Sequence, residues 1–351
     1  MRPPEASAAL ARFGISGEAI QTEPLTQGLI NVAFKVFVAG RPRYVLQRIN
    51  TEVFKAPGLL MENILRLLPL LEAQDYTGLS LRPTMEGDPY IVDEFLGTWR
   101  LFEYIPNSIT VEHTRNPDTA REAGRILGRF HQLVLPAQVS DLHIHMPGFH
   151  DLDMRLRQLE AALVTGIPGR IETAEPLTEL AKGLQKVCRE IPLASLPKRI
   201  CHNDTKLSNF LFDQTTGRAL CLIDLDTLMP GVLLYDIGDV TYDLLRPEEP
   251  LRSREGTASI DLGMFEAFLQ GLKDSNLRIM KEELDWLSHG PVLMPFLHGI
   301  RALTDYLTGD RYYRVSFPGQ NLQRASGLLR FAESTSENLP ELGSLCRKTL
   351  G

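Results

Sequence analysis

Alternating apolar and polar positions mark the start of the chain. Between Val32 and Val38 every second residue is apolar, which is the period of a half-buried strand. The turn signal Ala39-Gly40-Arg41-Pro42 follows, and a second apolar run extends from Tyr44 to Ile49. We therefore predict a β-hairpin, preceded by an extended segment that starts near Ile20 and breaks at Thr26-Gln27-Gly28.

Helical spacing begins after this hairpin. Between Pro57 and Ala73, apolar side chains recur at intervals of three and four residues. Three strand-like runs come next: Leu79–Thr84, Pro89–Phe95 and Trp99–Ile105. Beyond Pro106 helical patterns prevail, interrupted by one short β segment around 209–226. The expected helices cover Thr119–Leu135, Leu152–Val164, Pro176–Ile191, Asp261–Lys273, Lys281–His289, Val292–Leu307 and Asn321–Glu333.

The change from strands to helices predicts an α+β protein with a boundary between Ile105 and Ser108. A β-rich first part, residues 1–105, would precede a larger and mainly helical part, residues 106–351.

Composition narrows the class of partner. The 351 residues are 43% hydrophobic and 23% charged with a net charge of −7, so we expect a globular chain that does not bind nucleic acid. The most apolar stretch, Gly290–Ile300, is too short to span a bilayer, so no membrane partner is expected. The four cysteines include no C-x-x-C pair and are interpreted as reduced thiols of a cytoplasmic protein. These features do not predict an oligomeric state.

The candidate chemistry lies in the sequence HNDTKLSN, residues 202–209, and in the apolar run that ends at Asp224. A hairpin between the two would bring Asp204, Asn209 and Asp224 together. An Asp, an Asn and a second Asp can orient an acceptor hydroxyl and hold Mg²⁺ against nucleotide phosphates, and the spacing H-x-D-x-x-x-x-N matches the catalytic loop of protein kinases. A solvent-exposed turn capped by Asp and Asn is the alternative interpretation.

The stretch HNDTKLSNFLFDQTTGRALCLIDLDTLMPGVLLYDIGD resembles the aminoglycoside phosphotransferase and choline kinase superfamily, and within it the N-acetylhexosamine 1-kinases. The resemblance continues in TQGLIN, YVLQRIN, LMENI, WRLFEYIPNS and GIRALTDYLTGDRYYRV. It implies a bilobal protein-kinase-like fold, with a nucleotide-binding lobe ending in a hinge and a catalytic, acceptor-binding lobe. It also implies ATP and Mg²⁺ as cofactors and an amino sugar as the small-molecule acceptor, phosphorylated on its anomeric hydroxyl.

Carried onto this chain, the resemblance assigns Asp204 as the catalytic base and Asn209 and Asp224 as Mg²⁺ ligands, with His202 supporting the loop. Lys206 would offset charge on the transferring phosphoryl group. The alternative for Lys206 is an ordinary exposed lysine.

In the first lobe, the resemblance places Arg48 where protein kinases carry the phosphate-pairing lysine, with Glu62 as its partner. A surface ion pair is the alternative. Gly28 and Asn31 would belong to a phosphate-binding loop. At the hinge, the backbone of Glu103 and Ile105 would bind the adenine edge.

The acceptor is less constrained. Arg301, Tyr312 and Tyr313, together with Asp305, suit a neutral sugar, whereas Asp243, Glu248 and Glu249 could accept a cation. Residues 240–258 depart from the sugar-kinase pattern. Two alternatives therefore stand beside the sugar kinase: a kinase of an aminoglycoside, choline, ethanolamine or homoserine-like alcohol, and a pseudokinase that binds nucleotide without turnover. We interpret His143, His145 and His150 as loop histidines rather than metal ligands.

Overall fold

The structure is a computed structural model that describes residues 4–26, 30–246 and 260–351. Its first part is an antiparallel sheet of five strands in the order β1-β2-β3-β5-β4. The hairpin prediction is confirmed, since β2 and β3 pair antiparallel and join through a turn at residues 39–40. The strands are β1 (Ile20–Leu25), β2 (Val32–Val38), β3 (Arg41–Arg48), β4 (Ile91–Asp93) and β5 (Gly97–Glu103).

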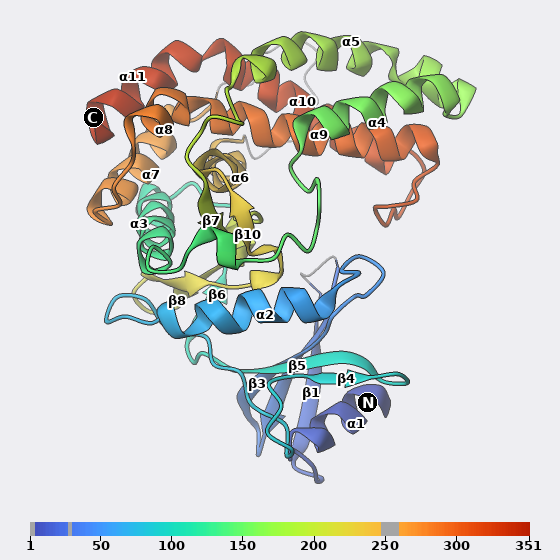
Figure 1. Cartoon of the computed structure of the whole chain (residues 1–351), viewed down its shortest axis with the longest axis vertical. Coiled ribbons are helices and arrows are strands. Elements are labelled where there is room, and N and C mark those ends of the chain that lie inside the picture. Colours follow the sequence, from blue (N-terminus) through green and yellow to red (C-terminus); the bar gives the residue numbers. More distant parts are fainter. Residues whose placement is uncertain (1–3, 27–29, 247–259) are drawn as a thin grey trace.

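Two helices flank this sheet, one on each side (Figure 1). The helix α1 (Pro4–Arg12) packs on one face, where Leu10, Leu46 and Trp99 share a hydrophobic cluster. The helix α2 (Pro57–Leu67) directs its apolar stripe toward the second part of the chain instead. It ends earlier than predicted, because Pro69 cannot continue the α-helical hydrogen bonds, and residues Leu68–Leu70 form one 3₁₀ turn.

The second part is a helical assembly that encloses three short strand pairings. The strands are β6 (Ser108–Thr110), β7 (Arg199–Cys201), β8 (Phe210–Asp213), β9 (Ala219–Leu222) and β10 (Met229–Gly231). The helices are α3 (Pro117–Leu133), α4 (Leu152–Thr165), α5 (Pro168–Glu190), α6 (Leu233–Leu245), α7 (Leu262–Asp274), α8 (Lys281–Trp286), α9 (Gly290–Thr308), α10 (Gln320–Glu337) and α11 (Leu339–Leu350). Figure 1 shows α4, α5, α9 and α10 at the end of the molecule opposite the sheet.

Close helix contacts in this part depend on glycine. A Cβ on Gly124 of α3 would lie 2.0 Å from the carbonyl oxygen of Phe268 on α7, and a Cβ on Gly271 would lie 1.7 Å from that of Arg121. The absence of a side chain at these two positions lets the helix backbones touch, so that α3 packs closely on α7 while it also contacts β9.

The fold class predicted from the sequence, α+β with a small sheet and a larger helical part, is confirmed. Some elements differ. Leu79–Thr84 is not a strand and contributes only a single bridge, between Leu81 and Phe102. The helix predicted from Pro176 begins at Pro168 and runs through Pro176. Helices α1, α6 and α11 were not anticipated. Within the described residues, every helix is too short or too polar to cross a membrane.

Candidate active site

The HNDTKLSN segment forms a tight loop that follows β7. Asn203 occupies the left-handed region with φ 63°, which non-glycine residues rarely adopt without support. Its Nδ2 supplies that support by donating to the carbonyl oxygens of Cys201, Thr227 and Met229 at 3.0–3.2 Å. The amide of Asn203 thereby ties the loop to the strand β10.

Asp236 of α6 holds this loop from beneath. Its buried carboxylate accepts the backbone N–H groups of His202, at 2.9 Å, and Asn203, at 2.7 Å. The ring of His131 on α3 lies 3.0 Å from the same carboxylate. Burial works to raise the pKa of Asp236, but these partners outweigh it and lower that pKa, so the carboxylate stays ionised.

Asp204, Lys206 and Asn209 meet at the surface of the loop. Lys206 Nζ lies 2.8 Å from Asp204 Oδ2, and Asn209 Nδ2 donates to the same oxygen at 3.0 Å. Burial works to raise the pKa of Asp204, but the charge of Lys206 outweighs it and lowers that pKa. Burial likewise opposes the charge on Lys206, but the carboxylates of Asp204 and Asp224 raise its pKa above the usual range. Both groups are therefore charged at neutral pH.

Asp224 follows β9 and lies close to this cluster. It also adopts the left-handed conformation, with φ 61°. Burial, and next the neighbouring carboxylate of Asp226, raise its pKa to about 6. Within the described residues no N–H or O–H group donates to its carboxylate, and none donates to the amide oxygen of Asn209. An oxygen pair without donors suits a hard divalent cation such as Mg²⁺.

His202 joins the two loops. Its Nδ1 accepts the N–H of Asp204 at 3.3 Å, and its Nε2 donates to the carbonyl oxygen of Ile223 at 2.9 Å. The backbone of Ile223 in turn donates to the carbonyl oxygen of Asn209 at 2.8 Å. Asp204, Asn209 and Asp224 are therefore brought together as the hairpin pattern predicts.

The predicted pairing of Arg48 with Glu62 is wrong. Arg48 lies on the α1 face of the sheet, over the ring of Trp99, and its Nη1 is 3.0 Å from Glu5. Glu62 on α2 instead contacts His143, at 2.7 Å. Alternation correctly places Leu46 and Arg48 on one face of β3, but that face packs on α1 and is turned away from α2.

Arg100 on β5 supplies the cation that faces the second part of the chain, and the sequence reasoning missed it. Its Nε donates to Gln47 on β3 at 2.9 Å, and its Nη1 lies 2.5 Å from Asp226 Oδ1. Asn31 donates to the other oxygen of Asp226, at 2.5 Å, and accepts from the backbone of Asn50. Arg100 of β5 and Asn31, which directly precedes β2, thus both contact the loop that carries Asp224. An arginine within the apolar stretch WRLF was the available signal.

The other nucleotide-site predictions lie nearby. Glu103 is the last residue of β5, and Ile105 lies two residues beyond it. The N–H of Glu103 already donates to the carbonyl oxygen of Ser80, at 2.9 Å. The carbonyl oxygen of Ile105 accepts the hydroxyl of Ser108, at 2.6 Å. Of the backbone groups predicted to bind adenine, these two are therefore engaged. Gly28 lies outside the described residues.

One face of α9 continues from the Asp204 cluster. His298 Nε2 lies 2.9 Å from Asp239 Oδ1, and the charge of His298 contributes to lowering the pKa of Asp204. One turn further along, Arg301 donates to the hydroxyl of Tyr312 at 3.2 Å. Tyr313 packs edge-on against Tyr312, with ring centroids 4.8 Å apart. The predicted acceptor residues are thus neighbours of one another.

Four acidic residues were predicted at the acceptor site: Asp305 for a neutral sugar, and Asp243, Glu248 and Glu249 for a cation. Asp305 is buried, and its carboxylate accepts the backbone N–H groups of residues 311, 312 and 313. Asp243 accepts the N–H of Leu207 at 2.9 Å, and burial raises its pKa to about 6. Glu248 and Glu249 lie outside the described residues.

Residues 21–271 match the profile of the phosphotransferase enzyme family, which is more than half of the chain. The chain belongs to that family. The chain is therefore a phosphotransferase.

Solved structures of family members share the fold at low sequence identity. A microcompartment-associated aminopropanol kinase aligns with 96% of this chain and 98% of its own, with a TM-score of 0.66 and 17% identity. An aminoglycoside phosphotransferase from Alicyclobacillus acidocaldarius aligns over 99% and 98%, with a TM-score of 0.63 and 15% identity. A spectinomycin phosphotransferase in complex with ADP and spectinomycin aligns over 95% and 97%, with a TM-score of 0.59 and 12% identity.

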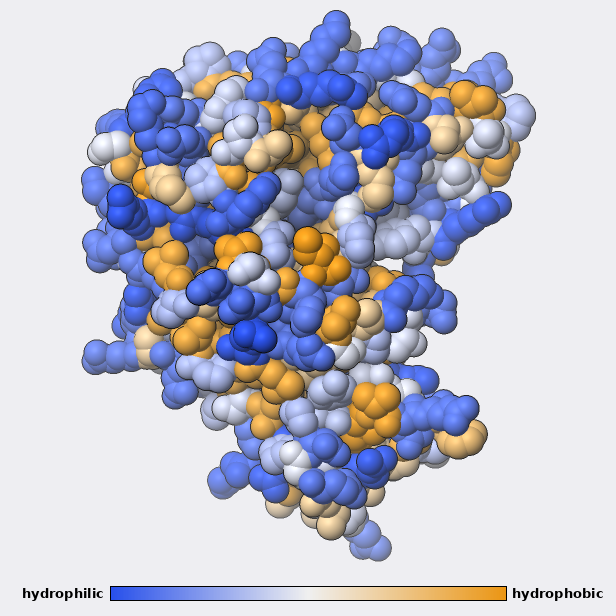
Figure 2. Space-filling model, in the orientation of Figure 1, coloured by the Kyte–Doolittle hydropathy of each residue, from blue (hydrophilic) through white to orange (hydrophobic). Residues whose placement is uncertain are grey.

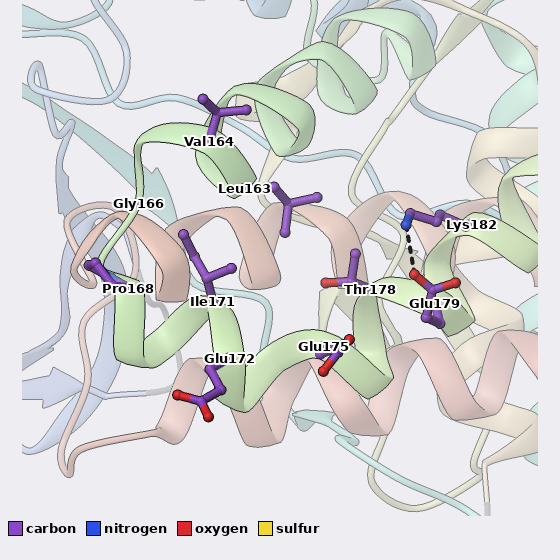
Figure 3. Close-up of a pocket in the computed structure, with 10 residues that line it drawn as sticks. All are labelled: Leu163, Val164, Gly166, Pro168, Ile171, Glu172, Glu175, Thr178, Glu179 and Lys182. Carbon is purple, nitrogen blue, oxygen red and sulfur yellow. Dashed lines mark hydrogen bonds and ion pairs between the residues drawn. The ribbon is translucent and has the colours of Figure 1, made fainter.

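Two hollows of this phosphotransferase lie apart from the Asp204 cluster. A groove of about 600 Å³ between α4 and α5 is lined by Leu163, Ile171 and three glutamates, one of them paired with Lys182 (Figure 3). A second, of about 550 Å³, lies beside His150 and Tyr235. His145 and His150 are buried and bond to backbone carbonyls, and no metal-binding group of three or more His, Cys, Asp or Glu occurs among the described residues.

Proposed function

We propose that this phosphotransferase is an ATP- and Mg²⁺-dependent sugar 1-kinase whose acceptor is an N-acetylhexosamine. Residues 1–105 would bind the nucleotide, and residues 106–351 would carry the catalytic groups and the acceptor. The observation that carries the kinase assignment is a cluster of four side chains on two neighbouring loops. Asp204, Lys206 and Asn209 come from the loop after β7, and Asp224 comes from the loop after β9. A binding module without turnover has no chemical need for that whole set.

The reaction would be a direct in-line transfer. Asp204 accepts the proton of the anomeric hydroxyl as its oxygen bonds to the γ-phosphorus, and the bond from that phosphorus to the bridging oxygen of ADP breaks. The low pKa of Asp204 keeps it ionised for this role. Lys206, held 2.8 Å from Asp204, would place its charge beside the transferring phosphoryl group.

Asn209 and Asp224 would hold Mg²⁺, which offsets the charge of the nucleotide phosphates when it is bound. Within the described residues, the side-chain oxygens of Asn209 and Asp224 accept no hydrogen bond. Burial and the neighbouring carboxylate of Asp226 raise the pKa of Asp224, and a bound cation would counteract both effects. Arg100 and Asn31, through Asp226, would keep that loop in place.

Arg301 and Tyr312 support a sugar as the acceptor, because a guanidinium and a phenol hydroxyl can both bond to ring hydroxyls. The resemblance of HNDTKLSN and GIRALTDYL to N-acetylhexosamine 1-kinases points in the same direction. A cationic acceptor is less well supported, since the carboxylate of Asp243 already accepts the N–H of Leu207. The second candidate is a kinase of an amino alcohol, and the structural similarity to an aminopropanol kinase favours it.

The test is phosphorus NMR of the purified protein with Mg²⁺-ATP and a panel of acceptors. The panel holds N-acetylglucosamine, N-acetylgalactosamine, plain hexoses, choline, aminopropanol, homoserine and kanamycin. We expect a sugar 1-phosphate, identified by coupling of its phosphorus to the anomeric proton. Transfer to an amino alcohol alone would retain the kinase and reject the sugar. Tight nucleotide binding without any product would favour the pseudokinase.

A further inference from the structure

Three arginine side chains from three helices gather around Tyr312 and Tyr313. Arg301 of α9 lies with its guanidinium carbon 5.3 Å from the ring centre of Phe149 and 5.6 Å from that of Tyr312. Arg155 of α4 donates to the backbone carbonyl oxygen of Phe149, at 3.1 Å. Arg324 of α10 lies 4.8 Å from the ring centre of Tyr313. The cluster is therefore cationic, in a protein whose net charge is −7.

Within the described residues, none of the three guanidinium groups has a carboxylate at ion-pair distance. In the part of the chain that the structure describes, Arg155 bonds to Gln158 and to the carbonyl oxygen of Phe149, and its buried Nε meets no acceptor there. Burial lowers the pKa of Arg155, and the charge of Arg301 lowers it further. Two like charges thus lie close together and one of them has a buried donor without an acceptor, which costs free energy unless an anion completes the arrangement.

The nearest carboxylates are committed elsewhere. Asp305 accepts backbone amides and Asn321, and Asp310 pairs with Arg170, at 2.5 Å. Asp151 accepts the N–H of Met154 as the N-cap of α4. Each of these carboxylates already has its own donors, and none of them forms an ion pair with the three arginines.

The cluster adjoins the reacting groups. Arg301 is one helical turn from His298, which contacts Asp239 and influences Asp204. Arg301 also contributes to the lowered pKa of His150, whose ring lies 6.1 Å from that of His298. A small acceptor with its hydroxyl at Asp204 would therefore extend along α9 toward Arg301 and Arg155.

We propose that Arg155, together with Arg301, forms an anion subsite in the acceptor pocket, so that the preferred acceptor is a sugar bearing a carboxylate or phosphate group. The inference rests on the proposed function in taking the acceptor to be a sugar. It adds that the anionic group contacts the guanidinium of Arg155 and that Tyr312 and Phe149 flank it. A neutral N-acetylhexosamine is then a weaker substrate than an acidic sugar of the same size.

The test compares matched pairs of sugars by calorimetry on the intact protein saturated with Mg²⁺ and a non-hydrolysable ATP analogue. The carboxylate pair is glucose and glucuronic acid, and the phosphate pair is N-acetylglucosamine and its 6-phosphate. We expect the acidic member of at least one pair to bind about tenfold or more tightly, because hydrogen bonds to a charged group are the strong ones. The pair that shows this advantage identifies which anion is recognised.

Variants assign the advantage to the arginine. Arg155→Met should remove it while leaving the dissociation constant of the neutral sugar within about twofold, and Arg155→Lys should restore part of it. Arg157→Met is the matched control, since Arg157 is exposed on the same helix and its loss changes the net charge equally. It should retain the full advantage.

Equal or weaker binding of both acidic sugars by the wild type would overturn the subsite, and so would an advantage that survives in Arg155→Met. Phosphorylation of N-acetylglucosamine together with such a result would leave the proposed function standing and remove only this inference. Binding of an acidic sugar that depends on Arg155, without phosphorylation of any sugar, would retain the subsite and reject the sugar kinase.

Discussion

Arg100 offers the sharpest test of how the sheet is coupled to the loop that carries Asp224 and Asp226. Its side chain is 1% exposed and that of Asp226 is 3% exposed, so the ion pair between them is shielded from water. Arg100→Met would leave the Asp226 carboxylate buried with Asn31 as its remaining side-chain donor. Arg48→Met is the matched control on the neighbouring strand, because its contact with Glu5 is 38% and 55% exposed.

The expected effects differ in size. Removing one partner of a buried ion pair costs about 3–5 kcal/mol, whereas an exposed pair contributes about 0–1 kcal/mol. With an unfolding entropy of about 2.1 cal/mol/K per residue, a chain of 351 residues changes its melting temperature by about 1.4 °C per kcal/mol. We expect Arg100→Met to melt about 4–7 °C below the wild type and Arg48→Met within about 2 °C of it.

Differential scanning fluorimetry at pH 7.5 measures both variants in one experiment. Adding Asp226→Asn to Arg100→Met removes the unpaired charge and should recover part of the lost stability. Equal melting temperatures for the two single variants would refute the assignment of Arg100 as the buried partner. A double variant that melts as low as Arg100→Met would show that the cost does not come from the unpaired, buried charge of Asp226.

Three further predictions concern the catalytic base, a buried histidine and the contact between α3 and α7. Asp204→Asn should lower kcat by ~10²–10⁴-fold and leave the dissociation constant of Mg²⁺-ATP nearly unchanged, and near-normal turnover would contradict its role as base. Burial, and next the charge of His298, lower the pKa of His150 to about 3. In the unfolded chain His150 takes up a proton below about pH 6.5, whereas in the native state it stays neutral down to about pH 3. The free energy of unfolding therefore falls as the pH drops from about 6.5 to about 3. His150→Gln should lose about 3 °C less in melting temperature than the wild type between pH 7.5 and 5.0, and an unchanged pH dependence would exclude this group as the cause. Gly124→Ala should lower stability by about 1–3 kcal/mol in chemical denaturation because its Cβ would overlap Phe268, whereas Gly183→Ala, in open space on α5, should raise it by up to about 1 kcal/mol.

The loop that carries Asp224 is held from both parts of the chain. Arg100 of β5 and Asn31, which directly precedes β2, both contact the carboxylate of Asp226. The ring of His145 bonds to the backbone carbonyl oxygen of Asp226, at 2.7 Å. On α2, the buried amide of Asn63 donates to the carbonyl oxygen of Leu228 at 2.8 Å. A movement of the sheet against the helices would therefore displace the loop that carries Asp224 relative to Asp204.

The local sequence pattern was sufficient to predict those elements whose conformation is determined by residues close together in the chain. The two-residue period of β2 and the turn after it predicted the hairpin, and helical spacing predicted α3, α4, α7, α9 and α10 to within a few residues at most ends. The convergence of Asp204, Asn209 and Asp224 was also predictable, because a short hairpin joins the two loops and constrains their separation.

Contacts between distant segments decided the rest. Alternation established that Leu46 and Arg48 share a face of β3, but not that α1 covers this face, since a strand carries no information about which element packs on either side. Arg48 therefore pairs with Glu5, and Glu62 pairs with His143, 81 residues away. Arg100 meets Asp226 only because β5 packs against the loop that carries Asp224 and Asp226. The sequence alone determined the elements and the reactive loop, because short-range geometry fixes both; the tertiary structure decided which charged groups pair, because burial and distance in space govern those energies.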